Sequence, residues 1–198
     1  MISMDKNNYF LEAKEKAINL LDKSKSKNKV DTRIEQILDL INKSDKFYTS
    51  SSCSGRIVLI ELPKIGDKKG ANFLGKWHKQ IKQNEIELAA KKGKNGMLWL
   101  LAQSPILHIA ADTNNAADKL LKIAISCGFK NSGLKSIIGK IIIEICSTER
   151  LDAPIGENGT LFCDEKYLNL LVDISNEIIN RSNYKLQRFK RELNIFNY

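Results

Sequence analysis

The chain has 198 residues, 42% of them hydrophobic, so it is long enough to bury a core, either as one domain or as two small halves. Lysine and arginine number 32 against 23 aspartates and glutamates, and the formal net charge of +9 suits either a polyanionic partner or a lysine-rich solvated surface. No apolar run reaches the roughly 20 residues that span a bilayer, residues 1–8 lack a signal-peptide core, and the four cysteines form no C-x-x-C pair. These features argue against a membrane protein, a disulfide framework and a zinc ribbon, and they predict a cytoplasmic protein without a metal site.

Two helices are predicted at the start of the chain. Apolar residues recur at helical spacing over residues 10–21, and Asp31 or Thr32 can cap a second helix that ends near Asn42. The predicted buried face of the second helix consists of Ile34, Ile37, Leu38 and Ile41. The basic linker between the helices, residues 23–29, is either a solvated loop or a contact for phosphates.

A run of small polar residues, 48–56, precedes an apolar segment, 57–60, that is typical of a buried strand. Small side chains allow a ligand to approach the backbone, and Arg56 offers a fork of donors for a carboxylate or phosphate. The alternative is a serine-rich turn whose hydroxyls bond to nearby backbone groups. A loop is then predicted at residues 66–70.

The segment 73–78 places Trp77 beside His78 and a lysine. These rings can form a stacking platform for a base, or Trp77 can be a core residue. A short helix is predicted over residues 81–90, and Asn95-Gly96 predicts a turn.

Residues 97–102 and 106–110 predict two strands interrupted by Pro105, with His108 in the second. His108 is either a half-buried histidine with satisfied hydrogen bonds or a functional group. A helix capped by Asp112 or Thr113 is predicted to follow, with Gly128 just after its end.

Residues 141–145 predict a further strand, and the segment 136–143 aligns without gaps on 52–59. This similarity leaves open an internal duplication with halves of about 1–110 and 111–198. Asp164 can cap a last helix, followed by a basic tail that serves either RNA or solubility. Its predicted apolar stripe consists of Tyr167, Leu168, Leu171, Ile174 and Ile178.

Several common active sites are not supported by the sequence. There is no phosphate-binding P-loop, no G-x-G-x-x-G fingerprint of a Rossmann site and no G-x-S-x-G elbow. A hydrolase that uses Ser52 or Cys53 with His108 and Asp112 remains an open alternative, because such triads depend on geometry.

Four further blocks accompany the serine run in a fixed order: 73–78, 103–108, 128–133 and 147–154. Together they resemble the wybutosine-synthesising methyltransferase family of archaea and eukaryotes, over residues 21–173. The resemblance implies transfer of a methyl group from S-adenosylmethionine to N4 of a tricyclic guanosine derivative just 3′ of the anticodon, in the anticodon loop of phenylalanine tRNA (tRNA-Phe). It also implies a single domain, 1–198, with an α+β fold: a curved, barrel-like mixed sheet with flanking helices, not a Rossmann fold. A non-catalytic RNA-binding module is the alternative function.

The expected site combines hydroxyl, imidazole and guanidinium groups from these blocks. His108 is the expected proton acceptor because an imidazole titrates near neutrality, and Ser104 borders the transfer site with it. The expected cofactor or substrate contacts are Ser51, Ser52, Ser54 and Arg56 for the cofactor carboxylate or RNA backbone, Trp77 and His78 for ring stacking, and Asn131 and Ser132 for hydrogen bonds to the base.

Overall fold

The computed structural model describes residues 6–67 and 69–196, which form two compact units. Within the described chain, the first unit comprises residues 6–54, 105–148 and 183–196, and the second comprises residues 55–67, 69–104 and 149–182. The chain therefore alternates between the units, and each unit is assembled from segments far apart in the sequence.

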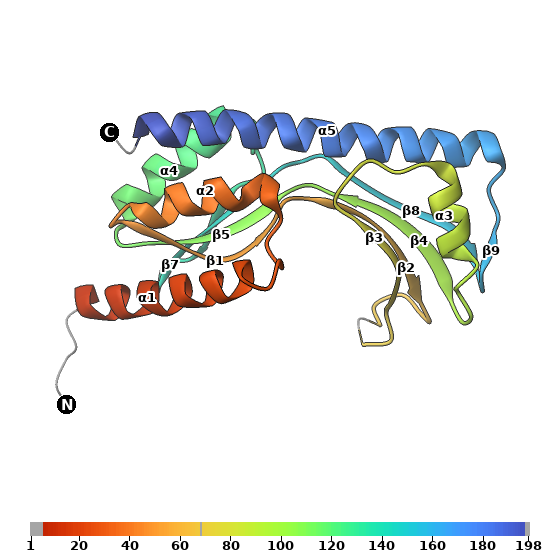
Figure 1. The fold of residues 1–198 in the computed structure, drawn as a ribbon, viewed down its shortest axis with the longest axis horizontal. Helices are drawn as coiled ribbons and strands as arrows, with labels where there is room; N and C mark the ends of the chain where they lie inside the picture. Colours follow the sequence, from red (N-terminus) through yellow and green to blue (C-terminus); the bar gives the residue numbers. More distant parts are fainter. Residues whose placement is uncertain (1–5, 68, 197–198) are drawn as a thin grey trace. The chain divides into compact units, whose positions relative to one another are not determined.

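The first unit is built on a four-stranded sheet in the order β1 (Phe47–Cys53), β5 (Ile106–Ala111), β7 (Ile141–Cys146) and β6 (Gly133–Ser136). Helices α2 (Thr32–Lys43) and α4 (Asn114–Ser126) cover one face, together with residues 183–196 of α5 (Glu165–Phe196), and α1 (Lys6–Lys25) lies on the other face (Figure 1). Alternate strand residues point to opposite faces. The helix-covered face therefore carries the core residues Leu107, Ile109, Ile143 and Ile145, each 0% exposed.

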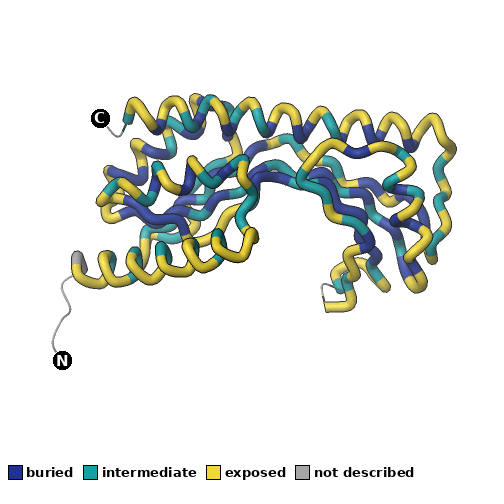
Figure 2. The backbone as a smooth tube through the Cα atoms, in the orientation of Figure 1, coloured by how far each residue is buried: buried dark blue, intermediate teal, exposed yellow. Residues whose placement is uncertain are grey.

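The second unit is built on a five-stranded sheet in the order β3 (Asn72–Trp77), β2 (Arg56–Leu62), β4 (Met97–Gln103), β8 (Arg150–Glu157) and β9 (Thr160–Leu161). Helix α3 (Gln83–Ala90) and residues 165–182 of α5 cover one face, while the sheet itself curves strongly (Figure 1). Register shifts at Leu59/Ile60 and Leu98/Trp99 accompany the curvature, as β-bulges usually do. Figure 2 shows the buried residues following the strands of both sheets.

The predicted helix boundaries follow from capping chemistry. Asp31 caps α2 by accepting from the backbone N–H of Arg33, and Thr113 caps α4 by accepting from that of Ala116. Gly128 follows α4 with a φ of +102°, a conformation that glycine adopts without strain. All four predicted core residues of α2 are buried.

The α+β class with helices flanking the sheets is confirmed, and the arrangement is not a Rossmann fold. The mixed sheet was a wrong expectation, because every strand pairing in the described part of the chain is antiparallel. The serine-rich segment is not a turn: Ser50, Ser51 and Ser52 belong to β1, and only Ser54 and Gly55 separate β1 from β2. The basic linker is also partly helical, since α1 continues to Lys25.

The buried face of the last helix includes only part of the predicted apolar stripe. Leu168, Leu171 and Ile178 are buried, but Tyr167 and Ile174 are 49% and 39% exposed. Helix α5 continues to Phe196, so the predicted basic tail is helical. No helix among residues 6–67 and 69–196 is long and apolar enough to cross a membrane.

The two aligned segments both contain a glycine with positive φ between two strands: Gly55 at +89° and Gly139 at +75°. Strands β6 and β7 pair with each other, whereas β1 and β2 belong to different sheets. The predicted halves of a duplication, about 1–110 and 111–198, do not coincide with the two units, each of which contains residues from both halves. Internal duplication and the single-domain assignment therefore stay predictions.

Gly156 in β8 offers a test of the second unit. A Cβ atom there would lie 2.0 Å from the backbone oxygen of Thr160, so strand β9 must shift. We expect Gly156→Ala to lower the free energy of unfolding by about 3 kcal/mol, as for other overpacked sites, measured by urea denaturation. Gly133→Ala is the matched control, because no atom lies within 4 Å of its Cβ position. Equal stability of the two variants would contradict the packing at β9.

Candidate functional site

A row of four polar side chains crosses the sheet of the first unit, one from each strand. Ser51 Oγ lies 2.8 Å from His108 Nδ1, and His108 Nε2 lies 2.9 Å from Glu144 Oε2. The other carboxylate oxygen, Glu144 Oε1, lies 2.7 Å from Lys135 Nζ. The row follows the strand order β1, β5, β7, β6, and we call it the polar row.

Strand register and side-chain alternation place the polar row. Ser51 pairs with His108, and His108 pairs with Glu144, so the three side chains point to the same face. A bulge between Thr49 and Ser51 changes the alternation of β1, which brings Ser51 opposite His108. Ser51 is exposed, and the His108 and Glu144 side chains are 30% and 16% exposed, so the row is accessible to a ligand.

The charges of the row determine its hydrogen bonds. The hydrogen bond from Lys135 lowers the pKa of Glu144, burial opposes this shift, and the bond with His108 adds to it. Glu144 is therefore ionised at neutral pH and can only accept. His108 must then carry its proton on Nε2, so that in neutral imidazole Nδ1 is an acceptor and Ser51 is the donor to it.

A second cluster in the first unit joins Asp31, Arg33 and Ser54. Arg33 donates to both carboxylate oxygens of Asp31 and, at 2.7 Å, to the hydroxyl of Ser54, which is 0% exposed. Ser54 in turn donates to Asp31. Ser54 is thus part of a partly buried network that joins the start of α2 to the end of β1.

This network predicts a dependence of stability on pH. Burial alone would raise the pKa of Asp31, but hydrogen bonds from Arg33 and Ser54 outweigh it and lower the value from 3.8 to about 2. Ionised Asp31 therefore contributes about 2 kcal/mol to the free energy of unfolding. This contribution is complete above the pKa that Asp31 has in the unfolded chain, and it is lost as the pH falls through the lower pKa of the folded chain. Asp31→Asn keeps a capping oxygen but cannot ionise. At neutral pH we expect this variant to be less stable than the wild-type chain. The difference in the free energy of unfolding should shrink as the pH falls from about 5 to about 2, measured by denaturant unfolding. A deficit independent of pH would contradict the assignment.

Arg56 is held on the sheet of the second unit. Its Nε donates to Gln103 Oε1 at 2.9 Å, and its guanidinium carbon lies 5.8 Å from the centre of the Phe73 ring. His78 Nδ1 lies 3.0 Å from the carbonyl oxygen of Gly55, next to Arg56 in the chain. These contacts fix the orientation of a side chain that suits carboxylate binding.

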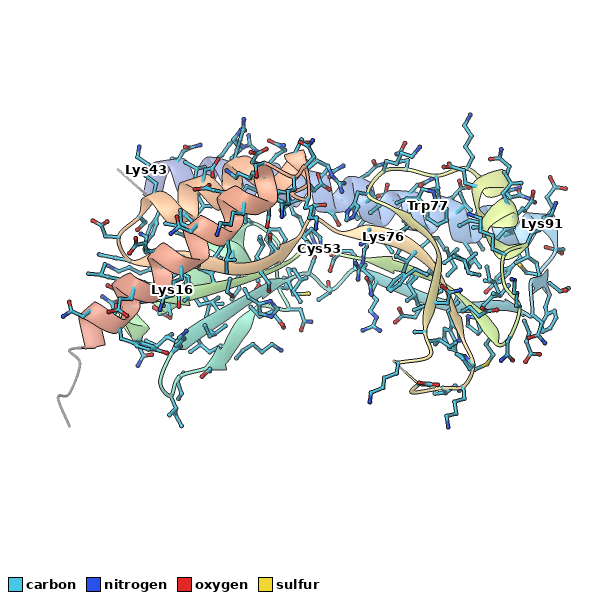
Figure 3. All side chains as sticks on the ribbon, turned by 60° about the horizontal axis from the view of Figure 1, so that its bottom comes forward. Lys16, Lys43, Cys53, Lys76, Trp77 and Lys91 are labelled. Carbon is cyan, nitrogen blue, oxygen red and sulfur yellow. The ribbon has the colours of Figure 1, made fainter. Side chains whose placement is uncertain are left out.

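Trp77 faces away from Arg56. It pairs with Ile57, which is 0% exposed on the helix-covered face, whereas Arg56 precedes Ile57 and therefore points to the opposite face. The Trp77 ring lies over Gly75, whose added Cβ would come within 2.0 Å of it, and it packs partly against the core. Figure 3 labels Trp77 beside Lys76, its exposed neighbour in β3. This packing favours a structural role for the Trp77 ring.

The remaining predicted residues lie as follows. Ser52 is exposed in β1, and Ser104 is half-buried in the link between β4 and β5. The Ser132 hydroxyl donates to the carbonyl of Phe129 and accepts from the backbone of Cys146, so it supports local structure. Asn131 is exposed, and its backbone N–H donates to the carbonyl of Cys146.

The structure thus brings Ser51 to His108 and adds Glu144 and Lys135, which the sequence reasoning missed. The signal for Glu144 is visible in hindsight: it is the one charged residue in the isoleucine-rich strand β7. The hydrolase triad is not formed, because the partners of the His108 ring are Ser51 and Glu144 and not Ser52 and Asp112. Across residues 6–67 and 69–196 there is no group of three or more metal-ligating side chains.

Comparisons with known proteins identify the family. The family model described as Methyltransferase TYW3 matches residues 12–195. A Pyrococcus horikoshii protein named tRNA(Phe) 7-((3-amino-3-carboxypropyl)-4-demethylwyosine(37)-N(4))-methyltransferase 1 is 46% identical over 95% of this chain and 96% of its own length. A Methanocaldococcus jannaschii protein whose name specifies the same methyltransferase is 40% identical over 93% of this chain and 96% of its own length.

Solved structures agree with the sequence comparisons. A structure of the PH1069 protein from Pyrococcus horikoshii has a TM-score of 0.91 and 44% identity, and covers 96% of this chain and 98% of that one. A structure of a hypothetical protein from Aeropyrum pernix has a TM-score of 0.71 and 33% identity, and covers 82% of this chain and 96% of that one. The chain is a methyltransferase of the TYW3 family.

Proposed function

We propose that this chain transfers the methyl group of S-adenosylmethionine to N4 of the 4-demethylwyosine base, bearing a 3-amino-3-carboxypropyl side chain, at position 37 of tRNA(Phe). The proposal is supported by the names of relatives that align over nearly the whole chain. Position 37 lies just 3′ of the anticodon, in a loop that presents its bases largely unstacked, so little energy is needed to expose the base. A non-catalytic RNA-binding module is not favoured.

The polar row is the observation in the structure that best supports this chemistry. A sulfonium is a strong electrophile, so the protein must chiefly hold the donor carbon and the ring nitrogen in line at about 3 Å. Replacing a ring N–H by N–CH₃ also releases a proton. His108, with an unprotonated Nδ1 and a side chain that is 30% exposed, is placed to receive it.

The other residues contribute binding in this proposal. Arg56, oriented by Gln103 and Phe73, is suited to a carboxylate, and both the cofactor and the 3-amino-3-carboxypropyl side chain carry one. Ser52, Ser104 and Asn131 are proposed to donate hydrogen bonds to the cofactor or the base. Stacking by Trp77 and His78 remains a weaker part of the proposal, because Trp77 packs partly against the core.

Transfer of a labelled methyl group tests the proposal. The chain is incubated with methyl-labelled S-adenosylmethionine and one of two tRNAs: tRNA(Phe) carrying the 4-demethylwyosine derivative, or the same tRNA with guanosine at position 37. We expect label in the first tRNA only. Label in neither tRNA would overturn the proposed function, and equal label in both would overturn the assignment of the substrate base.

A further inference from the structure

The hydrogen-bond directions in the polar row define a path for the departing proton. Because the ionised Glu144 accepts from Nε2–H, the only ring position of neutral His108 that can take a proton is Nδ1. Nδ1 is already occupied by the hydroxyl of Ser51 at 2.8 Å. A substrate proton therefore reaches the ring only by displacing this hydroxyl or by passing through it.

Ser51 is the better placed of the two groups for contact with substrate. It is exposed, whereas the His108 ring is 30% exposed and hydrogen-bonded at both nitrogens. Its oxygen has a lone pair available while its proton is donated to Nδ1. A hydroxyl activated by an adjacent imidazole, which is in turn oriented by a carboxylate, is a general arrangement for proton transfer at serine.

We propose that Ser51 is the catalytic group that takes the proton from the substrate nitrogen and passes its own hydroxyl proton to His108, with Glu144 as the positioning residue. This inference rests on the proposed function and specifies its proton path. In the step, the substrate N–H bond breaks, a bond forms between nitrogen and the methyl carbon, and the S–CH₃ bond breaks to leave a neutral thioether. The net proton resides on the His108 imidazolium, stabilised by the carboxylate of Glu144.

The arrangement gives Lys135 and Glu144 separate roles. The ion pair with Lys135 keeps Glu144 ionised, and the ionised carboxylate selects the histidine tautomer with a proton on Nε2. An amide at position 144 could instead donate to Nε2, which would permit the other tautomer. In that tautomer Nδ1 carries a proton and cannot accept one from Ser51.

The test compares single-turnover rates of methyl transfer at saturating S-adenosylmethionine and tRNA. We expect Ser51→Ala and Glu144→Gln each to lower this rate by about 10² to 10⁴-fold, while the dissociation constants of cofactor and tRNA stay close to wild type. Ser50→Ala is the matched control, because Ser50 donates to the backbone carbonyl of His108 and not to its ring. We expect its rate to stay close to wild type.

A double variant tests whether Ser51 and His108 act in series. Because removal of either group breaks a serial path, the Ser51→Ala/His108→Ala variant should be no slower than the slower single variant. If the fold-losses of the two single variants multiply in the double variant, the relay is overturned. A single-turnover rate at saturating substrate that Ser51→Ala leaves unchanged would also overturn it. A raised dissociation constant with an unchanged rate would assign Ser51 to binding instead. Ser51 is exposed, so its alanine variant should fold even if Glu144→Gln does not. A wild-type chain that transfers no methyl group would overturn the proposed function and the relay with it.

Discussion

Replacing His108 by alanine is expected to lower the single-turnover rate of methyl transfer by about 10² to 10⁴-fold, the usual contribution of a general base. The ring is the only group in the polar row that can store the proton, since Ser51 is a poor base and Glu144 is held ionised by Lys135. Binding of cofactor and tRNA should change little, because the ring is largely enclosed by its partners.

Rapid-quench measurements at saturating substrate check this expectation. Asp118→Asn on the exposed surface of α4 is a suitable control, since it removes one carboxylate that pairs with Lys122 in a surface contact. Added imidazole should restore part of the activity of His108→Ala. A variant with wild-type turnover would remove His108 from the proton-accepting role.

Affinity for the tRNA substrate is expected to fall by about 10³-fold between roughly 50 and 200 mM salt if about six phosphates are contacted. The net charge of +9 supports this expectation, but the cations differ in availability. Lys25 is engaged by Glu35 and Asp39, and Lys190 by Gln36. Figure 3 labels exposed lysines in other positions: Lys16, Lys43, Lys76 and Lys91.

Filter-binding titrations over a salt series measure the slope. The slope is that of the logarithm of the binding constant against the logarithm of the salt concentration. Replacing one exposed lysine that contacts a phosphate, for example Lys16→Gln, should reduce the magnitude of this slope by slightly less than one, whereas Lys25→Gln should leave it unaltered. An affinity that stays flat over this range would show that the positive charge serves solubility and not RNA binding.

The elements that the sequence predicts best are those with a strong apolar period. Helix α2 and strands β2, β4 and β7 are examples, because burial of one face sets both their structure and their orientation. Strand β3 was missed, because residues 72–77 alternate poorly and contain a glycine over which Trp77 packs. The serines of β1 have weak strand preference, so only their pairing with β5 places them in a sheet.

The candidate site was only half predictable for a similar reason. Resemblance to the family selected Ser51 and His108, but their contact depends on the pairing of strands whose residues lie 57 positions apart. Glu144 lies in β7, 36 positions after His108, and Lys135 lies in β6. No local pattern encodes this strand order. Likewise, alternation in β2 and β3 places Trp77 and Arg56 on opposite faces, which the proximity of their blocks does not reveal.

Mass spectrometry of the nucleosides from reacted tRNA tests the central claim most directly. After incubation of the chain with S-adenosylmethionine and tRNA(Phe) that carries the 4-demethylwyosine derivative, fragmentation should locate one added methyl group on N4 of the tricyclic base. A methyl group on the ribose, on the side chain or on another nucleoside would contradict the account, as would a base that keeps its original mass.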